Sequence, residues 1–110
     1  MTYTAVVVSA HLPSQGPIDL GVLVLDEQHD RLYFRFRTDL EGIIADPLDL
    51  EVVQGYPGMI ESMAVETGAL GLLQCLEDRL SNAIRLSERL AIQADTAADA
   101  VELAFAEYVA

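Results

Sequence analysis

Arginines are the residues of this sequence whose type and spacing suggest chemistry. The chain has 6 basic residues against 18 acidic ones, and every basic residue is an arginine. Arg31, Arg35 and Arg37 lie in one segment that alternates apolar and polar residues, and Arg85 and Arg89 lie in another. Side chains two or four positions apart share one face of a β-strand. We therefore expect both groups to lie on one face of a sheet.

The chemistry expected of this face is anion recognition, because guanidinium groups form paired hydrogen bonds with carboxylates and phosphates. The spacing predicts a basic patch on an otherwise acidic protein. The residues assigned to this patch are Tyr33, Arg35, Arg37, Arg85, Ser87 and Arg89. The alternative interpretation is that acidic residues of the chain itself neutralise these arginines, or that the face is simply solvated.

A second cluster, Asp26-Glu27-Gln28-His29-Asp30, gathers four potential metal ligands in five residues. It has neither the calcium-loop pattern of an EF-hand nor the His or Cys spacing of a closed zinc site. We interpret it as the polar turn of a β-hairpin. A metal-dependent enzyme at Asp26, Glu27, His29 and Asp30 is kept as a third alternative.

The histidines do not form a recognisable catalytic motif. His11 and His29, with Ser9 or Ser14 and an acid, supply the residue types of a triad, but a triad is defined by geometry. The sequence has no nucleophile elbow, no phosphate-binding glycine loop and no His-Glu-x-x-His motif. We therefore assign no catalytic residue, no metal and no cofactor.

Three strands are predicted to position the first arginine group. Thr2 to Leu12 is rich in β-branched residues and is broken by Pro13-Ser14-Gln15-Gly16-Pro17. Ile18 to Asp26 is apolar on both faces. Arg31 to Arg37 alternates, so that its apolar residues lie opposite its arginines; these are Leu32, Phe34 and Phe36.

Helices are predicted for the middle and the end of the chain. Asp46 and Pro47 are a typical N-cap and first helical residue, which predicts a helix over 47–54. Met59 to Leu80 has helical spacing interrupted near Gly68, which indicates two helices or a kink, with Thr67 available to cap the second. Thr96 begins a final amphipathic helix.

A late strand completes the predicted fold. Ile84, Leu86, Leu90 and Ile92 alternate with Arg85, Ser87, Arg89 and Ala91, although Glu88 interrupts the apolar side. The residue types of this segment favour a helix, but a helix would scatter its apolar residues around the circumference, so a strand is preferred. We predict one α+β domain over residues 1–110: an antiparallel meander of three strands plus this fourth late strand, with the helices packed on one face. Exposed strand edges would favour a homodimer or addition of a partner strand.

The order of these features resembles a family of small bacterial proteins, number 3037 in the domain-of-unknown-function series. The likeness lies in Tyr3 before the Val6-Val7-Val8 run, Pro13, Asp19-Leu20-Gly21-Val22, Asp46-Pro47 and the ending Phe105-Ala106-Glu107-Tyr108-Val109. The family has Asn in many members where Asp19 stands. The resemblance implies a bacterial, non-secreted protein with a partner encoded by a neighbouring gene, and it transfers no catalytic residue.

Composition narrows the classes of function. A formal charge of −12 and the absence of lysine disfavour binding of duplex nucleic acid. No apolar run is long enough to span a membrane and the start has no basic signal-peptide region, so we expect a cytoplasmic protein. Cys75 is expected to be a small buried apolar residue.

The function expected from these observations is a non-enzymatic interaction or regulatory protein. It would be an acidic accessory subunit or an antitoxin-like binder of another protein. The alternative is a binder of a small anionic ligand or of single-stranded nucleic acid through the face with Tyr33 and the arginines.

Overall fold

An antiparallel sheet is the centre of the structure. The computed structural model describes residues 1–12, 16–78 and 84–109, without the side chains of residues 70 and 75–78. The strands are β1 (Thr2–Leu12), β2 (Gly16–Asp26), β3 (Arg31–Phe36), β4 (Ile84–Leu86) and β5 (Leu90–Gln93). β3 pairs with β2, β2 with β1, and both β4 and β5 pair with the far side of β1. The predicted α+β class, the three-strand meander and the late strand are confirmed.

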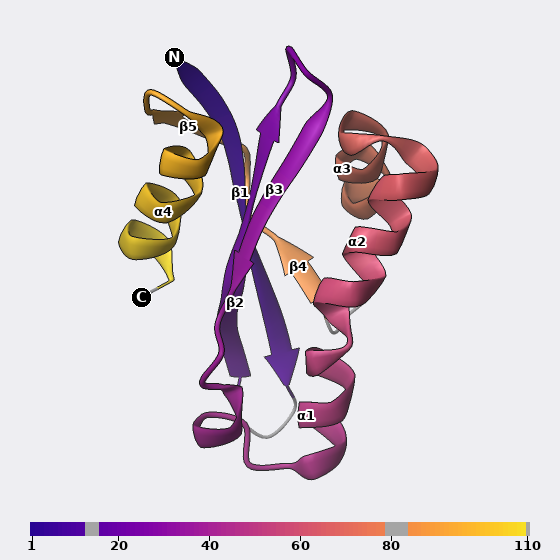
Figure 1. Ribbon diagram of the computed structural model, residues 1–110. Coiled ribbons are helices and arrows are strands. Elements are labelled where there is room, and N and C mark those ends of the chain that lie inside the picture. The colour runs from indigo at the N-terminus through magenta and orange to yellow at the C-terminus, as the bar shows by residue number, and fades with distance from the viewer. Residues whose placement is uncertain (13–15, 79–83, 110) are drawn as a thin grey trace.

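Helices cover both faces of this sheet, which corrects the prediction that they pack on one face. They are the 3₁₀ turn η1 (Leu40–Gly42), α1 (Pro47–Gln54), α2 (Tyr56–Thr67), α3 (Ala69–Asp78) and α4 (Ala97–Tyr108). Figure 1 shows α1, α2 and α3 on one side of the strands and α4 on the other. No helix in the described ranges is long and apolar enough to cross a membrane.

Two hydrophobic clusters explain the two layers of helices, because β1 and β2 present apolar side chains to both sides. Under α1 to α3, the buried residues of these strands include Val6, Val8, Leu20, Leu23 and Leu25. Under α4 they are Tyr3, Ala5, Val22 and Val24, which pack with Ile92 of β5 and with Ala97, Ala100, Val101 and Ala104. A sheet that is apolar on both faces needs cover on both faces.

Side-chain caps fix where the helices begin. The Asp46 carboxylate accepts hydrogen bonds from the backbone N–H groups of Leu48 and Asp49, and the Thr96 hydroxyl accepts one from Asp99. These caps and the boundaries of α1 and α4 agree with the predictions, and the break at Gly68 confirms two helices.

The cap of α3 differs from the expectation. The Thr67 hydroxyl donates to the Met63 carbonyl at 2.8 Å, and the Asp30 carboxylate accepts the Ala69 N–H at 3.2 Å instead. Gly68 has φ +76°, and a Cβ there would lie 2.9 Å from Asp30 Oδ2. Glycine is therefore required at the point where the turn between β2 and β3 meets α3.

The late strand is divided into β4 and β5, which corrects the prediction of one strand with a single arginine face. Leu86 pairs with Val8 and Leu90 with Ala5, so the late segment has one residue more than β1 between the same two pairs. An extra residue reverses the face of everything that follows it. Ile84 and Leu86 accordingly pack with the α1 to α3 cluster, whereas Leu90 and Ile92 pack with the α4 cluster.

Candidate functional site

Arg35 of the predicted patch contacts two residues of the chain itself. Its guanidinium forms an ion pair with Glu102 of α4 and lies over the Phe105 ring, 4.2 Å from the ring centroid. Both contacts come from the helix that covers this face of the sheet. Arg35 therefore links β3 to α4. This agrees with the alternative interpretation, in which acidic residues of the chain itself neutralise the arginines.

Arg37 is engaged by the chain in the same way. Its Nε and Nη2 donate to the two Asp39 oxygens at 3.0 and 3.2 Å, and its Nη1 donates to the Val109 carbonyl at 3.2 Å. The hydrogen-bonded Asp39 raises the pKa of Arg37, and Arg37 lowers the pKa of Asp39. Asp19 also raises the pKa of Arg37 through its negative charge.

Tyr33 is half-buried against the cluster beneath α4. Its ring is therefore not an open platform on which a nucleobase could stack. Arg31, which starts the same strand, is exposed at the hairpin end.

The residues of the late segment form a separate group. The Ser87 hydroxyl accepts the Val7 N–H at 2.8 Å and donates to the Glu88 carbonyl at 2.8 Å, which holds the extra residue in place. Arg85 belongs to β4 and pairs with Ser9, whereas Arg89 lies between β4 and β5, directly before the first residue of β5. The six predicted residues are thus divided between the β3 side and the β4 side instead of forming one patch. Arg79 and the Cys75 side chain lie outside the described part of the chain.

The turn after β2 is held by its own hydrogen bonds. Asp26 is buried, and its oxygens accept from the His29 N–H at 3.3 Å and contact His29 Nδ1 at 2.9 Å. The hydrogen bond with the His29 side chain is the main cause of the lowered Asp26 pKa. Because Asp30 is turned toward α3, the predicted ligands point to different partners. The described residues contain no cluster of three or more His, Cys, Asp or Glu side chains able to hold a metal.

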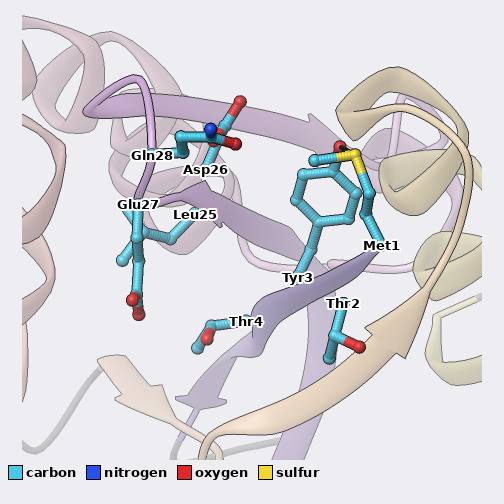
Figure 2. A pocket seen from close by; sticks show the side chains of 8 residues that line it. All are labelled: Met1, Thr2, Tyr3, Thr4, Leu25, Asp26, Glu27 and Gln28. Atoms are coloured by element: carbon cyan, nitrogen blue, oxygen red, sulfur yellow. Dashed lines mark hydrogen bonds between the residues drawn. The ribbon is translucent and has the colours of Figure 1, made fainter.

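A pocket of about 440 Å³ lies between this turn and the start of β1. Figure 2 shows Tyr3 and Met1 on one side of it and Asp26 and Gln28 on the other. Burial, followed by the charge of Asp26, raises the pKa of Tyr3. The pocket offers carboxylates without a basic lining residue, and both Asp26 oxygens are already engaged by His29.

A polar groove lies on the face of the sheet that α4 covers, at the opposite end of the strands and next to the end of α4. Its polar lining residues are Ser9, His11, Asp19, Arg85, Ser87 and Tyr108, and its volume is about 370 Å³. The site predicted from the sequence included Arg85 and Ser87 but missed Asp19 and Tyr108. Ser9 and His11 were considered only as residue types of a catalytic triad. The signal in the sequence is that Ser9 and His11 share a strand face, but their neighbours depend on strand order.

The outer side of α1 and α2 combines apolar and acidic residues. Leu48 and Val52, one helical turn apart, are 72% and 57% exposed, and Met59 and Val65 on α2 are also exposed. The segment 38–78 contains nine acidic residues and no Lys, Arg or His. The acids are Asp39, Glu41, Asp46, Asp49, Glu51, Glu61, Glu66, Glu77 and Asp78.

Comparison of the chain with protein-family models, with curated proteins and with solved structures gave no match.

Proposed function

We propose that the chain is a non-enzymatic interaction protein, an accessory or antitoxin-like subunit that docks on a basic surface of another protein. The docking surface is the outer face of α1 and α2, and the partner presents an apolar area rimmed by Lys and Arg. We expect the chain to be cytoplasmic and the partner to be encoded by a neighbouring gene.

The observation that carries this proposal is the exposure of Leu48 and Val52 in a segment, residues 38–78, that contains no basic residue. Burying exposed apolar side chains of this size against a partner lowers the free energy of the complex. The surrounding acids, Asp49 and Glu51 among them, would guide a basic partner to this face and oppose an acidic one. Charge complementarity thus favours a basic protein over a second copy of this acidic chain at this face.

The test is recovery of the partner by a tagged chain in its native host, followed by a binding measurement with the purified pair. Val52→Arg places a positive charge in the docking surface and should weaken binding by about tenfold or more. Leu103→Arg is the matched control, because Leu103 is 52% exposed on α4, on the opposite side of the sheet. It should bind like the unchanged chain.

The salt dependence adds a second criterion. Binding between an acidic face and a basic partner should weaken as salt rises, since exposed charges are screened over about 10 Å at 0.1 M salt. A chain that remains a lone monomer, or a partner that binds Val52→Arg as tightly as the unchanged chain, would contradict the proposal.

A further inference from the structure

The polar groove at the end of α4 exists because α4 is shorter than the sheet face beneath it. α4 ends at Tyr108, whereas β1 continues to Leu12 and β2 begins at Gly16 (Figure 1). The covered part of this face is lined by Tyr3, Ala5, Val22 and Val24. Beyond Tyr108 the face changes to Ser9, His11 and Asp19. The change from apolar to polar side chains coincides with the end of the helical cover.

A bulge between β1 and β2 helps to assemble this groove. Val8 pairs with Gly21 but Ser9 pairs with Asp19, so Leu20 is the additional residue. Leu20 is buried in the cluster beneath α1 to α3, which leaves Asp19 on the same face as Ser9. Bulges commonly redirect a side chain in this manner next to binding sites.

Three side chains form a row across the strands in the groove. Ser9 pairs with Asp19 on one side and with Arg85 on the other. Neighbouring strands are about 4.8 Å apart, so the backbones of Asp19 and Arg85 are separated by about 10 Å. His11 lies two residues after Ser9 on the same strand face, and Tyr108 closes the groove from α4.

The charges in this row are not equivalent. Asp19 lies close enough to Arg37 to raise its pKa, so part of its negative charge is offset. Arg85 is exposed, and its guanidinium has no hydrogen bond or ion pair with the described residues. Arg35 and Arg37, in contrast, have acidic partners. Arg85 is therefore the guanidinium of the groove that is free to bind a ligand.

We propose that this groove binds a small organic anion, independently of the docking surface on α1 and α2. Arg85 holds a carboxylate or phosphate group, for which its planar donors are suited. The hydroxyl of Tyr108 and the imidazole of His11 add hydrogen bonds to the anion, whereas the Ser9 hydroxyl donates to the Arg85 carbonyl at 3.4 Å. Asp19, at the other end of the row, accepts from a hydroxyl or ammonium group of the same ligand. The volume is that of a small metabolite site.

The test is a titration followed by the backbone amide signals of the isotope-labelled chain, with succinate, malate and inorganic phosphate as probes. Saturable shifts should appear at Ser9, His11 and Arg85. Shifts with succinate or malate indicate a carboxylate ligand, and shifts with inorganic phosphate indicate a phosphate ligand. Arg85→Gln should weaken binding by about tenfold or more. Arg31→Gln, which removes an equal charge at the far end of the same face, should leave it unchanged.

Malate and succinate differ by one hydroxyl, so they test the role of Asp19. Malate should bind more tightly than succinate to the unchanged chain, and Asp19→Ala, which removes the acceptor as well as the charge, should remove that preference while raising affinity for inorganic phosphate. Absence of saturable binding by all three probes, or equal binding to Arg85→Gln, would overturn the site. Equal affinity for malate and succinate in the unchanged chain would overturn the role of Asp19.

Discussion

The guanidinium of Arg35 lies between the Glu102 carboxylate and the Phe105 ring, and Arg37 reaches Asp39 and the Val109 carbonyl. Exposed ion pairs contribute at most about 1 kcal/mol each, and contact with an aromatic face adds about 0.5 to 1 kcal/mol. Changing Arg35 or Arg37 to Glu would therefore alter the attachment of α4 as well as the surface charge. Arg85 is the cleaner position at which to test recognition.

Asp26 predicts an acid-sensitive contribution to stability. Its folded pKa is lowered, mainly by the hydrogen bond with His29. The stabilisation from its carboxylate is therefore fully present above the unfolded pKa of about 3.9 and is lost as the pH falls through the lower folded value. Asp26→Asn should flatten the fall in unfolding free energy between about pH 5 and pH 3, measured by urea denaturation at each pH.

The control for this prediction is Glu27→Gln, which removes an equal charge at the exposed neighbouring position. It should leave the acid dependence steeper than that of Asp26→Asn. An acid dependence of Asp26→Asn that is as steep as that of the unchanged chain would show that the carboxylate contributes nothing over this range.

At the residue scale, alternation in the sequence predicted the face of Arg35 and Arg37 but not their partners. The face follows from the period of two along β3. Glu102 is 67 positions away from Arg35, and its proximity depends on α4 packing over that face. The metal-like composition of residues 26–30 was likewise correctly interpreted as a turn, whereas the contact of Asp30 with α3 required the tertiary structure.

At the scale of elements, Gly21 marks a close approach between β2 and β3. A Cβ at this position would lie 2.3 Å from the Arg35 carbonyl oxygen and 2.9 Å from Phe36 Cα. Because these are backbone atoms, rotation of a side chain cannot relieve the overlap. Gly21→Ala should lower the free energy of unfolding by about 1 to 3 kcal/mol, measured by urea denaturation.

Gly58→Ala is the matched control for that substitution. Nothing lies within 4 Å of a Cβ at Gly58, which belongs to α2. Alanine is favoured over glycine in a helix by up to about 1 kcal/mol, so stability should be unchanged or higher. Equal stability of Gly21→Ala and the unchanged chain would mean that the two strands separate without cost.

The boundaries of the elements were predictable because local chemistry sets them: Asp46 and Pro47 begin α1, Gly68 separates α2 from α3, and Thr96 caps α4. The placement of the helices on the two faces of the sheet was less predictable. The apolar character of Ile18 to Asp26 on both faces already indicated two-sided burial, and the one-sided prediction did not use it. The division of β4 from β5 arises from one extra residue relative to β1, which is visible only once the pairing is known.

At the scale of the whole molecule, 18 acidic residues against 6 basic ones make repulsion between like charges the main long-range electrostatic term. Added sodium chloride screens that repulsion, so the Tm should rise with salt. A gain of about 1 kcal/mol would correspond to about 4 °C. The measurement is thermal unfolding at increasing sodium chloride, and potassium chloride at the same ionic strength should give the same rise because screening depends on ionic strength. A falling Tm would mean that screened ion pairs such as Arg37 with Asp39 outweigh the repulsion.

The hydrogen bond from Ala69 to Asp30 joins positions 39 residues apart, and this has a consequence for the order of folding. Until the turn between β2 and β3 has formed, the Asp30 carboxylate is not in place to accept a free N–H group in the first turn of α3. Isolated helices of this length are marginal in water. We therefore expect α3 to consolidate after the hairpin during refolding, whereas α4, which carries its own cap at Thr96, can begin to form without it.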